Sequence, residues 1–73
     1  MTTTAQQAFL KRMGKRIKAK RQGLEMTRAE LARASDASKP TIQKVEDGAS
    51  NVTILVLTRI AAALQCEVAD LIC

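Results

Sequence analysis

The sequence predicts an all-α protein of five short helices, and three observations favour this fold class. The 73-residue chain is aliphatic, with Phe9 as its single aromatic residue, a composition typical of helices that pack on helices. Apolar residues recur every three or four positions along most of the chain. Gly23, Pro40, Gly48 and short polar clusters separate these runs. The length and the absence of repeats or long linkers predict one domain, residues 1–73.

The first helix is expected at about Ala5–Arg21. Phe9, Met13 and Ile17 follow one another at intervals of four, which predicts one inward face. Gly23 ends the helix. Basic residues crowd its other faces: Lys11, Arg12, Lys15, Arg16 and Lys18.

The second helix is expected at Arg28–Ala34. Thr27 is a good N-cap, and Glu30 three residues later completes the capping-box pattern. Leu31 and Ala32 are predicted to face inward. Together these signals predict a helix of about two turns.

A polar turn at residues 35–38 leads into a third helix at about Lys39–Asp47. Asp36 tolerates the left-handed backbone that such a turn needs. Ser38 can cap the third helix, and Pro40 suits its first turn. Two apolar residues three positions apart are predicted to form its inner face: Ile42 and Val45.

Asn51 and Thr53 open a fourth helix at about Ile54–Leu64. A last short helix is expected at Val68–Ile72, with Glu67 near its N-terminus. The predicted inward stripe of the fourth helix consists of apolar residues at helical spacing: Ile54, Leu57, Ile60, Ala61 and Leu64.

Leu55 and Val56 widen the apolar surface of the fourth helix beyond one stripe. An exposed apolar patch usually marks an interface. The pattern therefore predicts a two-fold homodimer through the fourth and last helices, with Leu55, Val56 and Arg59 at the interface. The alternative is a monomer with a wider core.

Charge is distributed unevenly along the chain, whose formal net charge is +5. Residues 1–44 hold eleven basic and three acidic residues, a net charge of +8, whereas residues 45–73 hold one basic and four acidic residues, a net charge of −3. This predicts a polyanionic partner, with nucleic acid as the first candidate, an anionic membrane surface as the second and a merely solvated face as the third. Because aromatic residues are nearly absent, recognition by base stacking is disfavoured.

Several function classes are disfavoured by what the composition lacks. The chain has no His and only two cysteines, Cys66 and Cys73, so no zinc set can be assembled. No cofactor or small-molecule ligand is indicated. Without His, Tyr or clustered carboxylates, an enzyme is not expected. No signal peptide or membrane-spanning stretch is visible, so a cytoplasmic protein with reduced thiols is predicted.

The two short helices around the polar turn match a helix-turn-helix over about residues 27–47. Such a motif places its second helix in the DNA major groove. Ala29 and Ala32 supply small residues for the helix crossing. The outer face of the second helix carries polar side chains rich in donors: Ser38, Lys39, Thr41, Gln43 and Lys44.

Residues 14–72 resemble the lambda-repressor-like (Cro/repressor, Xre-type) helix-turn-helix family. The resemblance is carried by GKRIKAKR, MTRAELA, SKPTIQKVEDG and NVTILVLTRIAAAL. It implies a compact five-helix DNA-binding domain of bacterial or phage origin that regulates transcription. Arg28 stands where the family usually has Gln, Asp36 where it has Gly, Ser35 where it has an apolar residue and Val52 where it has Pro.

The resemblance implies specific roles for side chains of the motif. Glu46 occupies the position of a structural glutamate, and Arg21 is its expected partner; the alternative is that Glu46 is an exposed charge. The implied base contacts are Gln43, Lys44, Thr41 and Lys39, and the implied phosphate contacts are Arg28, Ser38, Thr27, Lys15 and Arg16.

Among relatives of this kind, the chain is also similar to small restriction–modification controller proteins and phage Cro-like repressors. These imply a homodimer that binds double-stranded DNA at a pseudo-palindromic operator and regulates its own synthesis. The alternative function is an antitoxin or another protein-interaction module on the same fold.

Overall fold

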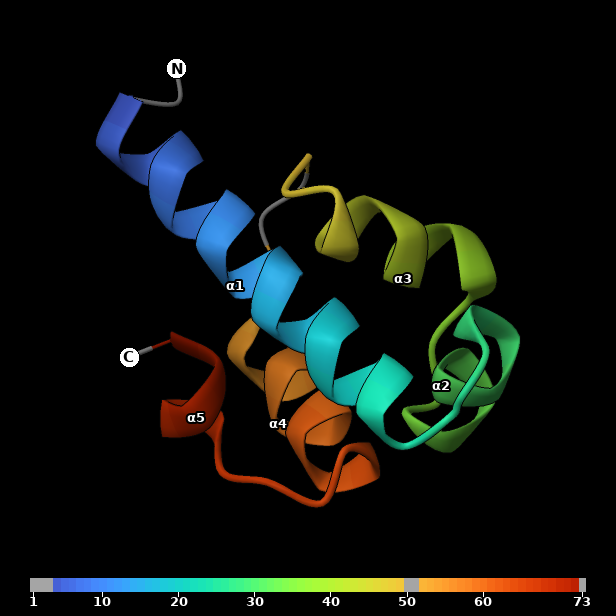
Figure 1. Cartoon of the computed structure of the whole chain (residues 1–73). Helices are drawn as coiled ribbons and strands as arrows, with labels where there is room; N and C mark the ends of the chain where they lie inside the picture. Colours follow the sequence, from blue (N-terminus) through green and yellow to red (C-terminus); the bar gives the residue numbers. More distant parts are fainter. Residues whose placement is uncertain (1–3, 50–51, 73) are drawn as a thin grey trace.

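Five helices follow one another in the computed structural model, which describes residues 4–49 and 52–72 (Figure 1). These residues contain no β-strand, so the predicted all-α fold class is confirmed. Asn51 and Cys73, both named above, lie outside the described residues. The bounds agree with the predicted ranges to within two residues: α1 Thr4–Gly23, α2 Arg28–Ala34, α3 Lys39–Glu46, α4 Ile54–Ala63 and α5 Val68–Ile72.

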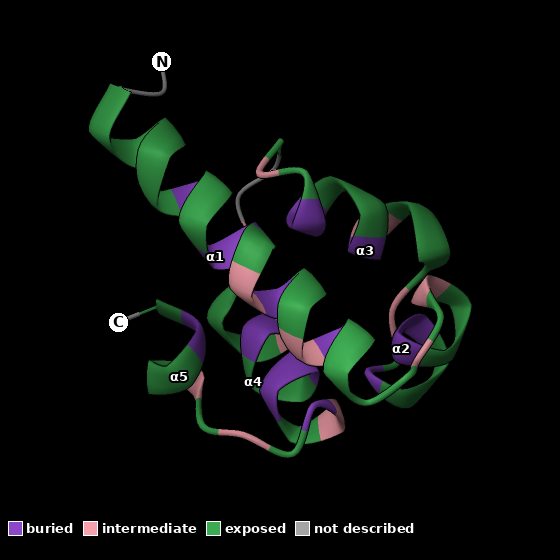
Figure 2. Ribbon diagram, viewed as in Figure 1, coloured by how far each residue is buried: buried purple, intermediate pink, exposed green. Residues whose placement is uncertain are grey.

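The long helix α1 organises the domain. It runs across the molecule with α3 on one side and α4 and α5 on the other (Figure 1). Helix α2 packs against α3 and α4, and α4 packs against α5. Buried positions therefore face the space that the five helices enclose (Figure 2). The core consists of aliphatic side chains from every helix: Leu10, Met13, Ile17, Leu31, Ala32, Ile42, Val45, Leu57, Ile60, Ala61, Leu64 and Leu71.

Two residues predicted to face the core are exposed instead. Phe9 keeps 38% of its surface exposed, and the buried position in that turn is Leu10. Ile54, the first residue of α4, is 76% exposed. Both predictions were wrong for the same reason: the helical spacing continues to Phe9 and Ile54, but both side chains line an open apolar groove between α1, α4 and the end of α5, where no further helix covers them.

The N-termini of α2, α3 and α4 are capped as the sequence predicts. The backbone N–H of Glu30 donates to Thr27 Oγ1 at 3.0 Å, and the backbone N–H of Thr27 donates to Glu30 Oε1 at 2.9 Å, which confirms the capping box. Ser38 caps α3 by accepting from the N–H of Thr41 at 3.2 Å. Thr53 caps α4 by accepting from the N–H of Val56. These caps satisfy N–H groups that have no partner within their helices.

Among residues 4–49 and 52–72, no helix combines the length and apolar character needed to cross a membrane.

Candidate nucleic-acid interface

Helices α2 and α3 pack on each other across the tight turn at residues 35–38. Asp36 adopts the left-handed conformation with φ of 57°, as predicted. The N–H of Ala37 donates to the carbonyl of Ala32 at 2.8 Å and closes the turn. Ala32 is buried at the helix crossing, whereas Ala29 is exposed, so the prediction that both alanines serve the crossing is half wrong. The segment therefore forms a helix-turn-helix.

Ser35, which stands in place of an apolar residue, is fully buried in the turn. Its hydroxyl donates to the carbonyl of Leu31 at 2.7 Å. A buried hydroxyl that has a hydrogen-bond partner costs little, so this departure from the family pattern is accommodated.

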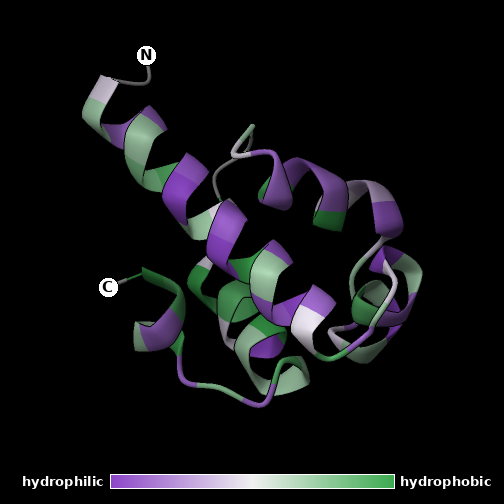
Figure 3. Ribbon diagram, viewed as in Figure 1, coloured by the Kyte–Doolittle hydropathy of each residue, from purple (hydrophilic) through white to green (hydrophobic). Residues whose placement is uncertain are grey.

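Helix α3 has one buried face and one exposed polar face. Ile42 and Val45 are buried, as their spacing predicts. Lys39, Gln43 and Lys44, three of the four predicted base contacts, are exposed. Figure 3 shows the outer side of α3 as predominantly hydrophilic. The helix therefore presents a ridge of donors and acceptors to solvent.

Thr41, the fourth predicted base contact, is half-buried. Its hydroxyl lies 2.7 Å from the hydroxyl of Ser38. The Ser38 oxygen also accepts from the N–H of Thr41, so both hydroxyls belong to the cap of α3. Thr27, a predicted phosphate contact, is engaged in the same way at the start of α2.

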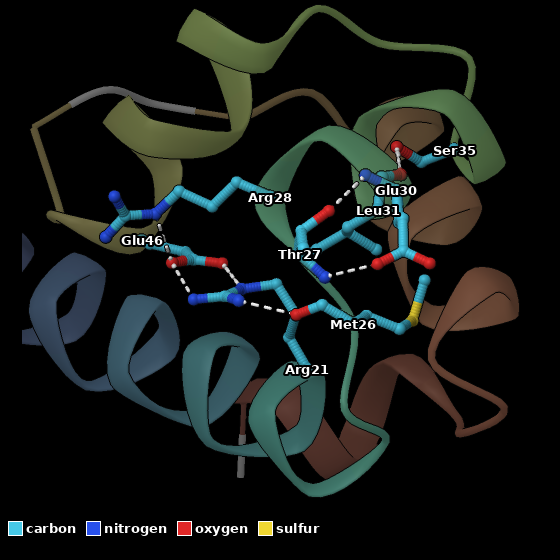
Figure 4. Close-up of polar contacts among 8 residues, drawn as sticks. All are labelled: Arg21, Met26, Thr27, Arg28, Glu30, Leu31, Ser35 and Glu46. Atoms are coloured by element: carbon cyan, nitrogen blue, oxygen red, sulfur yellow. Dashed lines mark hydrogen bonds and ion pairs between the residues drawn. The ribbon is translucent and has the colours of Figure 1, made fainter.

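Glu46 anchors the C-terminal end of α3 to the rest of the domain (Figure 4). Its carboxylate is buried and receives two hydrogen bonds from Arg21: Nε donates to Oε2 at 2.6 Å and Nη2 donates to Oε1 at 3.2 Å. Arg21 Nη1 donates to the carbonyl of Met26 at 2.7 Å. The predicted partnership of Arg21 and Glu46 is confirmed, and the alternative of an exposed Glu46 is wrong.

Arg28 joins the same carboxylate, a contact that the sequence did not predict. Its Nε donates to Glu46 Oε1 at 3.1 Å, and its side chain is 33% exposed. One edge of the Arg28 guanidinium is thus attached to α3, and part of the side chain remains open to solvent. The signal in the sequence was the departure from the family pattern, since the chain has Arg28 where the family usually has Gln.

Gly14 is a second feature that sequence reasoning missed. A Cβ added at Gly14 would lie 2.4 Å from the carbonyl oxygen of Glu46 and 2.5 Å from that of Val45. Helix α1 therefore approaches the end of α3 at backbone distance. Glycine in the middle of a helix is the signal, since it is unfavourable there without a packing reason.

The other predicted phosphate contacts lie on the surface of α1. Lys15 is exposed and Arg16 is half-buried. Neither is engaged in the ion pairs of the described residues, so both have charged ends available to a ligand.

The predicted dimer surface on α4 is only partly exposed. Leu55 has 60% of its surface exposed. Arg59 is also exposed and lies 4.0 Å from Asp36 in a loose ion pair. Val56, in contrast, is half-buried and packs against the core of its own chain. Leu55 is next to Ile54, whose exposed side chain lines an apolar groove between the start of α1, the start of α4 and the end of α5.

Among residues 4–49 and 52–72, no group of three or more acidic or cysteine side chains is placed to hold a metal ion. Cys66 is half-buried against the core, and this burial raises the pKa of its thiol.

Comparison with known proteins agrees with this geometry. The model of the HTH_3 helix-turn-helix family matches residues 17–71. Among solved structures, the restriction–modification controller protein C.AhdI from Aeromonas hydrophila superposes with a TM-score of 0.86 at 28% identity, over 88% of this chain and 97% of that one. No curated protein sequence matches significantly.

A second similar structure is the clp gene regulator ClgR from Corynebacterium glutamicum. It superposes with a TM-score of 0.83 at 28% identity, over 86% of this chain and 67% of that one. Both relatives share the arrangement of helices described above. The chain therefore belongs to the HTH_3 (Xre, lambda-repressor-like) helix-turn-helix family and has the fold of a DNA-binding transcription regulator.

Proposed function

We propose that this protein is a sequence-specific regulator of transcription, a single helix-turn-helix domain that inserts α3 into the major groove of double-stranded DNA. The observation that carries the proposal is the division of α3 into a buried face, fixed by Ile42, Val45 and Glu46, and an exposed ridge with Gln43 and Lys44. A rigid helix with polar side chains on its outer face suits the reading of base edges.

Each side chain of the ridge has a role in this proposal. Gln43 pairs with adenine through its amide, and Lys44 donates to the O6 and N7 acceptors of guanine. Lys39 and Thr41 contact bases or the adjacent phosphates. Because the Thr41 hydroxyl also serves the cap of α3, its contribution to base recognition is smaller than that of Gln43.

The phosphate contacts orient the domain on the duplex. Arg28, Lys15 and Arg16 supply charge, and the caps at Thr27 and Ser38 lie at the ends of the motif helices. The net charge of +8 over residues 1–44 supports binding to a polyanion. Such contacts give affinity without sequence preference, so specificity rests on the ridge.

We infer further that two copies bind a pseudo-palindromic operator. Leu55 and Arg59 form the dimer surface, with Val56 contributing only its exposed part. A two-fold dimer presents two copies of α3 about 34 Å apart, which is one turn of DNA. The similarity to a restriction–modification controller over nearly its full length supports a small autoregulatory protein, either a controller or a phage-type repressor.

Footprinting on the DNA upstream of the protein's own coding sequence tests this function. The expected result is a protected site with two inverted half-sites whose centres are about 10 base pairs apart. Gel filtration of the complex should give two protein copies per site. A uniform cleavage pattern over this DNA, together with no enriched motif after selection from random duplexes, would contradict sequence-specific regulation.

A further inference from the structure

The buried carboxylate of Glu46 accepts hydrogen bonds from two arginines, Arg21 and Arg28, which differ in how many of their donors are engaged within the protein. Arg21 uses Nε and Nη2 for Glu46 and Nη1 for the carbonyl of Met26. Its side chain is almost fully buried, so its role is structural. Arg28 uses only Nε in the hydrogen bonds described for it, at 3.1 Å from Oε1 of the same carboxylate.

The uncommitted part of Arg28 faces outward. Figure 4 shows its two terminal nitrogens on the side of the guanidinium away from Glu46. A guanidinium carries five N–H donors in a planar fork, and one bond through Nε leaves the terminal four. That fork matches two oxygens of a phosphate group. Arg28 is therefore oriented by Glu46 on one edge and available to an anion on the other.

The surroundings of Arg28 favour an anion. A polar hollow of about 370 Å³ lies beside it, lined by residues of the α1–α2 loop, the start of α2 and the start of α3: Arg21, Met26, Thr27, Arg28, Ala29 and Lys39. Three of these residues are cationic and none is acidic. Glu46 beneath them compensates one charge, so the mouth of the hollow keeps a net positive charge. A phosphate bound in the hollow places its negative charge beside both Arg28 and Lys39.

Glu46 also links this hollow to the orientation of α3. It is the last residue of α3, and its backbone lies against Gly14 of α1. An anion held by Arg28 is consequently connected through one carboxylate to the helix that carries Gln43 and Lys44. Contacts to phosphate fix the register of a protein on DNA.

We propose that Glu46 is a positioning residue that holds Arg28 as a preoriented clamp for one DNA phosphate, and that this clamp sets the register of α3 in the groove. The proposal rests on the proposed function, in that DNA supplies the phosphate. It differs from a general attraction between basic residues and DNA because it requires the geometry of arginine at position 28, and not only its charge.

The test compares Arg28→Ala and Arg28→Lys with the matched pair Arg33→Ala and Arg33→Lys, since Arg33 is an exposed arginine of the same helix. Affinity is measured by fluorescence anisotropy over a range of salt, on a duplex from the protein's own upstream region and on a scrambled duplex. Thermal unfolding of each variant is followed in parallel. Should Arg28→Lys not fold, Arg28→Gln replaces it.

Arg28→Ala is expected to weaken binding to both duplexes by the same factor, roughly tenfold or more. The slope of log K against log salt should fall by about 0.9, the value for one phosphate contact. Arg28→Lys should lose most of the same affinity. The compact ammonium group of lysine cannot donate to Glu46 from one edge and at the same time donate to two phosphate oxygens from another, as a planar guanidinium can. The Arg33 pair should show neither the tenfold loss nor a difference between Ala and Lys.

Wild-type affinity for Arg28→Lys in a folded protein would overturn the clamp, as would an unchanged salt slope for Arg28→Ala. Binding to the scrambled duplex distinguishes failure of the clamp from failure of the proposed sequence-specific function. If the wild-type protein does not discriminate between the duplexes but the Arg28 variants lose affinity and slope on both, the clamp stands and the sequence-specific function fails. If the wild type discriminates and Arg28→Lys matches it, the function stands and the clamp fails.

Discussion

Gly14 of α1 and Glu46 of α3 are in backbone contact: a Cβ on Gly14 would lie 2.4 Å from the carbonyl oxygen of Glu46. Since the opposing atoms are main-chain atoms, a rotamer change cannot make room for a side chain. The close approach brings α1 against the end of α3, where the buried Glu46 carboxylate meets Arg21. The position of α3 against α1 thus depends on the absence of a Cβ atom at residue 14.

Replacement of Gly14 by alanine should therefore destabilise the domain, although alanine is the better helix former. Overpacking of this kind costs about 1–3 kcal/mol. Urea unfolding followed by circular dichroism measures the change. Gly23→Ala is the matched control, because a Cβ at Gly23 has no atom within 4 Å. The control should be neutral or slightly stabilising, and a Gly14→Ala protein as stable as Gly23→Ala would refute the backbone contact.

The buried ion pair of Arg21 and Glu46 should contribute far more to the free energy of unfolding than the exposed ion pair of Arg59 and Asp36. Removal of one partner of a buried pair costs about 3–5 kcal/mol, and Arg21→Ala should fall near the lower end because Arg28 still contacts Glu46. Arg59→Ala breaks an exposed pair at 4.0 Å and should change the free energy of unfolding by less than about 1 kcal/mol. Similar losses from both substitutions in the same unfolding assay would contradict this ranking.

The capping box at the start of α2 predicts a pH-dependent contribution to stability. The hydrogen bond from the backbone N–H of Thr27, followed by that from its side chain, lowers the pKa of the Glu30 carboxyl. A carboxyl whose pKa is lower in the folded state stabilises that state above its unfolded-state pKa, and the effect is lost as pH falls through the folded-state pKa. The difference in stability between wild type and Glu30→Ala should therefore shrink in acid.

Thr27→Ala provides the companion measurement. Loss of an N-cap hydroxyl costs about 0.5–2 kcal/mol at neutral pH. In the variant, an NMR titration should show the pKa of Glu30 closer to its ordinary value, because one of the two hydrogen-bonding causes is gone. An unchanged Glu30 titration would show that the cap side chain has no part in the shift.

The proposed dimer surface can be tested by one added charge. Leu55 is exposed and next to the exposed Ile54, so Leu55→Glu should leave the fold intact and shift the sedimentation velocity from that of a dimer to that of a monomer. Ala19→Glu, at an exposed position of α1, is the matched control and should remain dimeric. If the Leu55→Glu variant still sediments as a dimer, this surface is not the dimer interface.

Local signals made most of the fold predictable. Caps such as Thr27 and Ser38, and the left-handed Asp36, act within a few residues of the chain and mark where helices begin and turn. The spacing of Ile42 and Val45 determines which face of α3 is buried. Because that choice also exposes the opposite face, the candidate reading ridge follows from the same local pattern.

Features that depend on how helices meet in space were not predictable in this way. Phe9 and Ile54 continue the apolar spacing of their helices, but the spacing does not reveal where a neighbouring helix ends. Likewise, the Gly14 contact and the sharing of Glu46 by Arg28 need the crossing of α1, α2 and α3. Arg21 and Glu46 could be paired only through the family resemblance, because they are 25 positions apart.

The most direct test of the account measures how strongly the exposed face of α3 discriminates DNA sequence. Binding of the wild type and of Gln43→Ala is followed by fluorescence anisotropy on the footprinted upstream site and on a scrambled duplex. The account predicts that the wild type prefers the specific site by at least about 10³-fold with a steep salt dependence. Gln43→Ala should lose roughly 1–3 kcal/mol of that preference while binding scrambled DNA as before. Equal affinity of the wild type for both duplexes would contradict the central claim that α3 reads sequence.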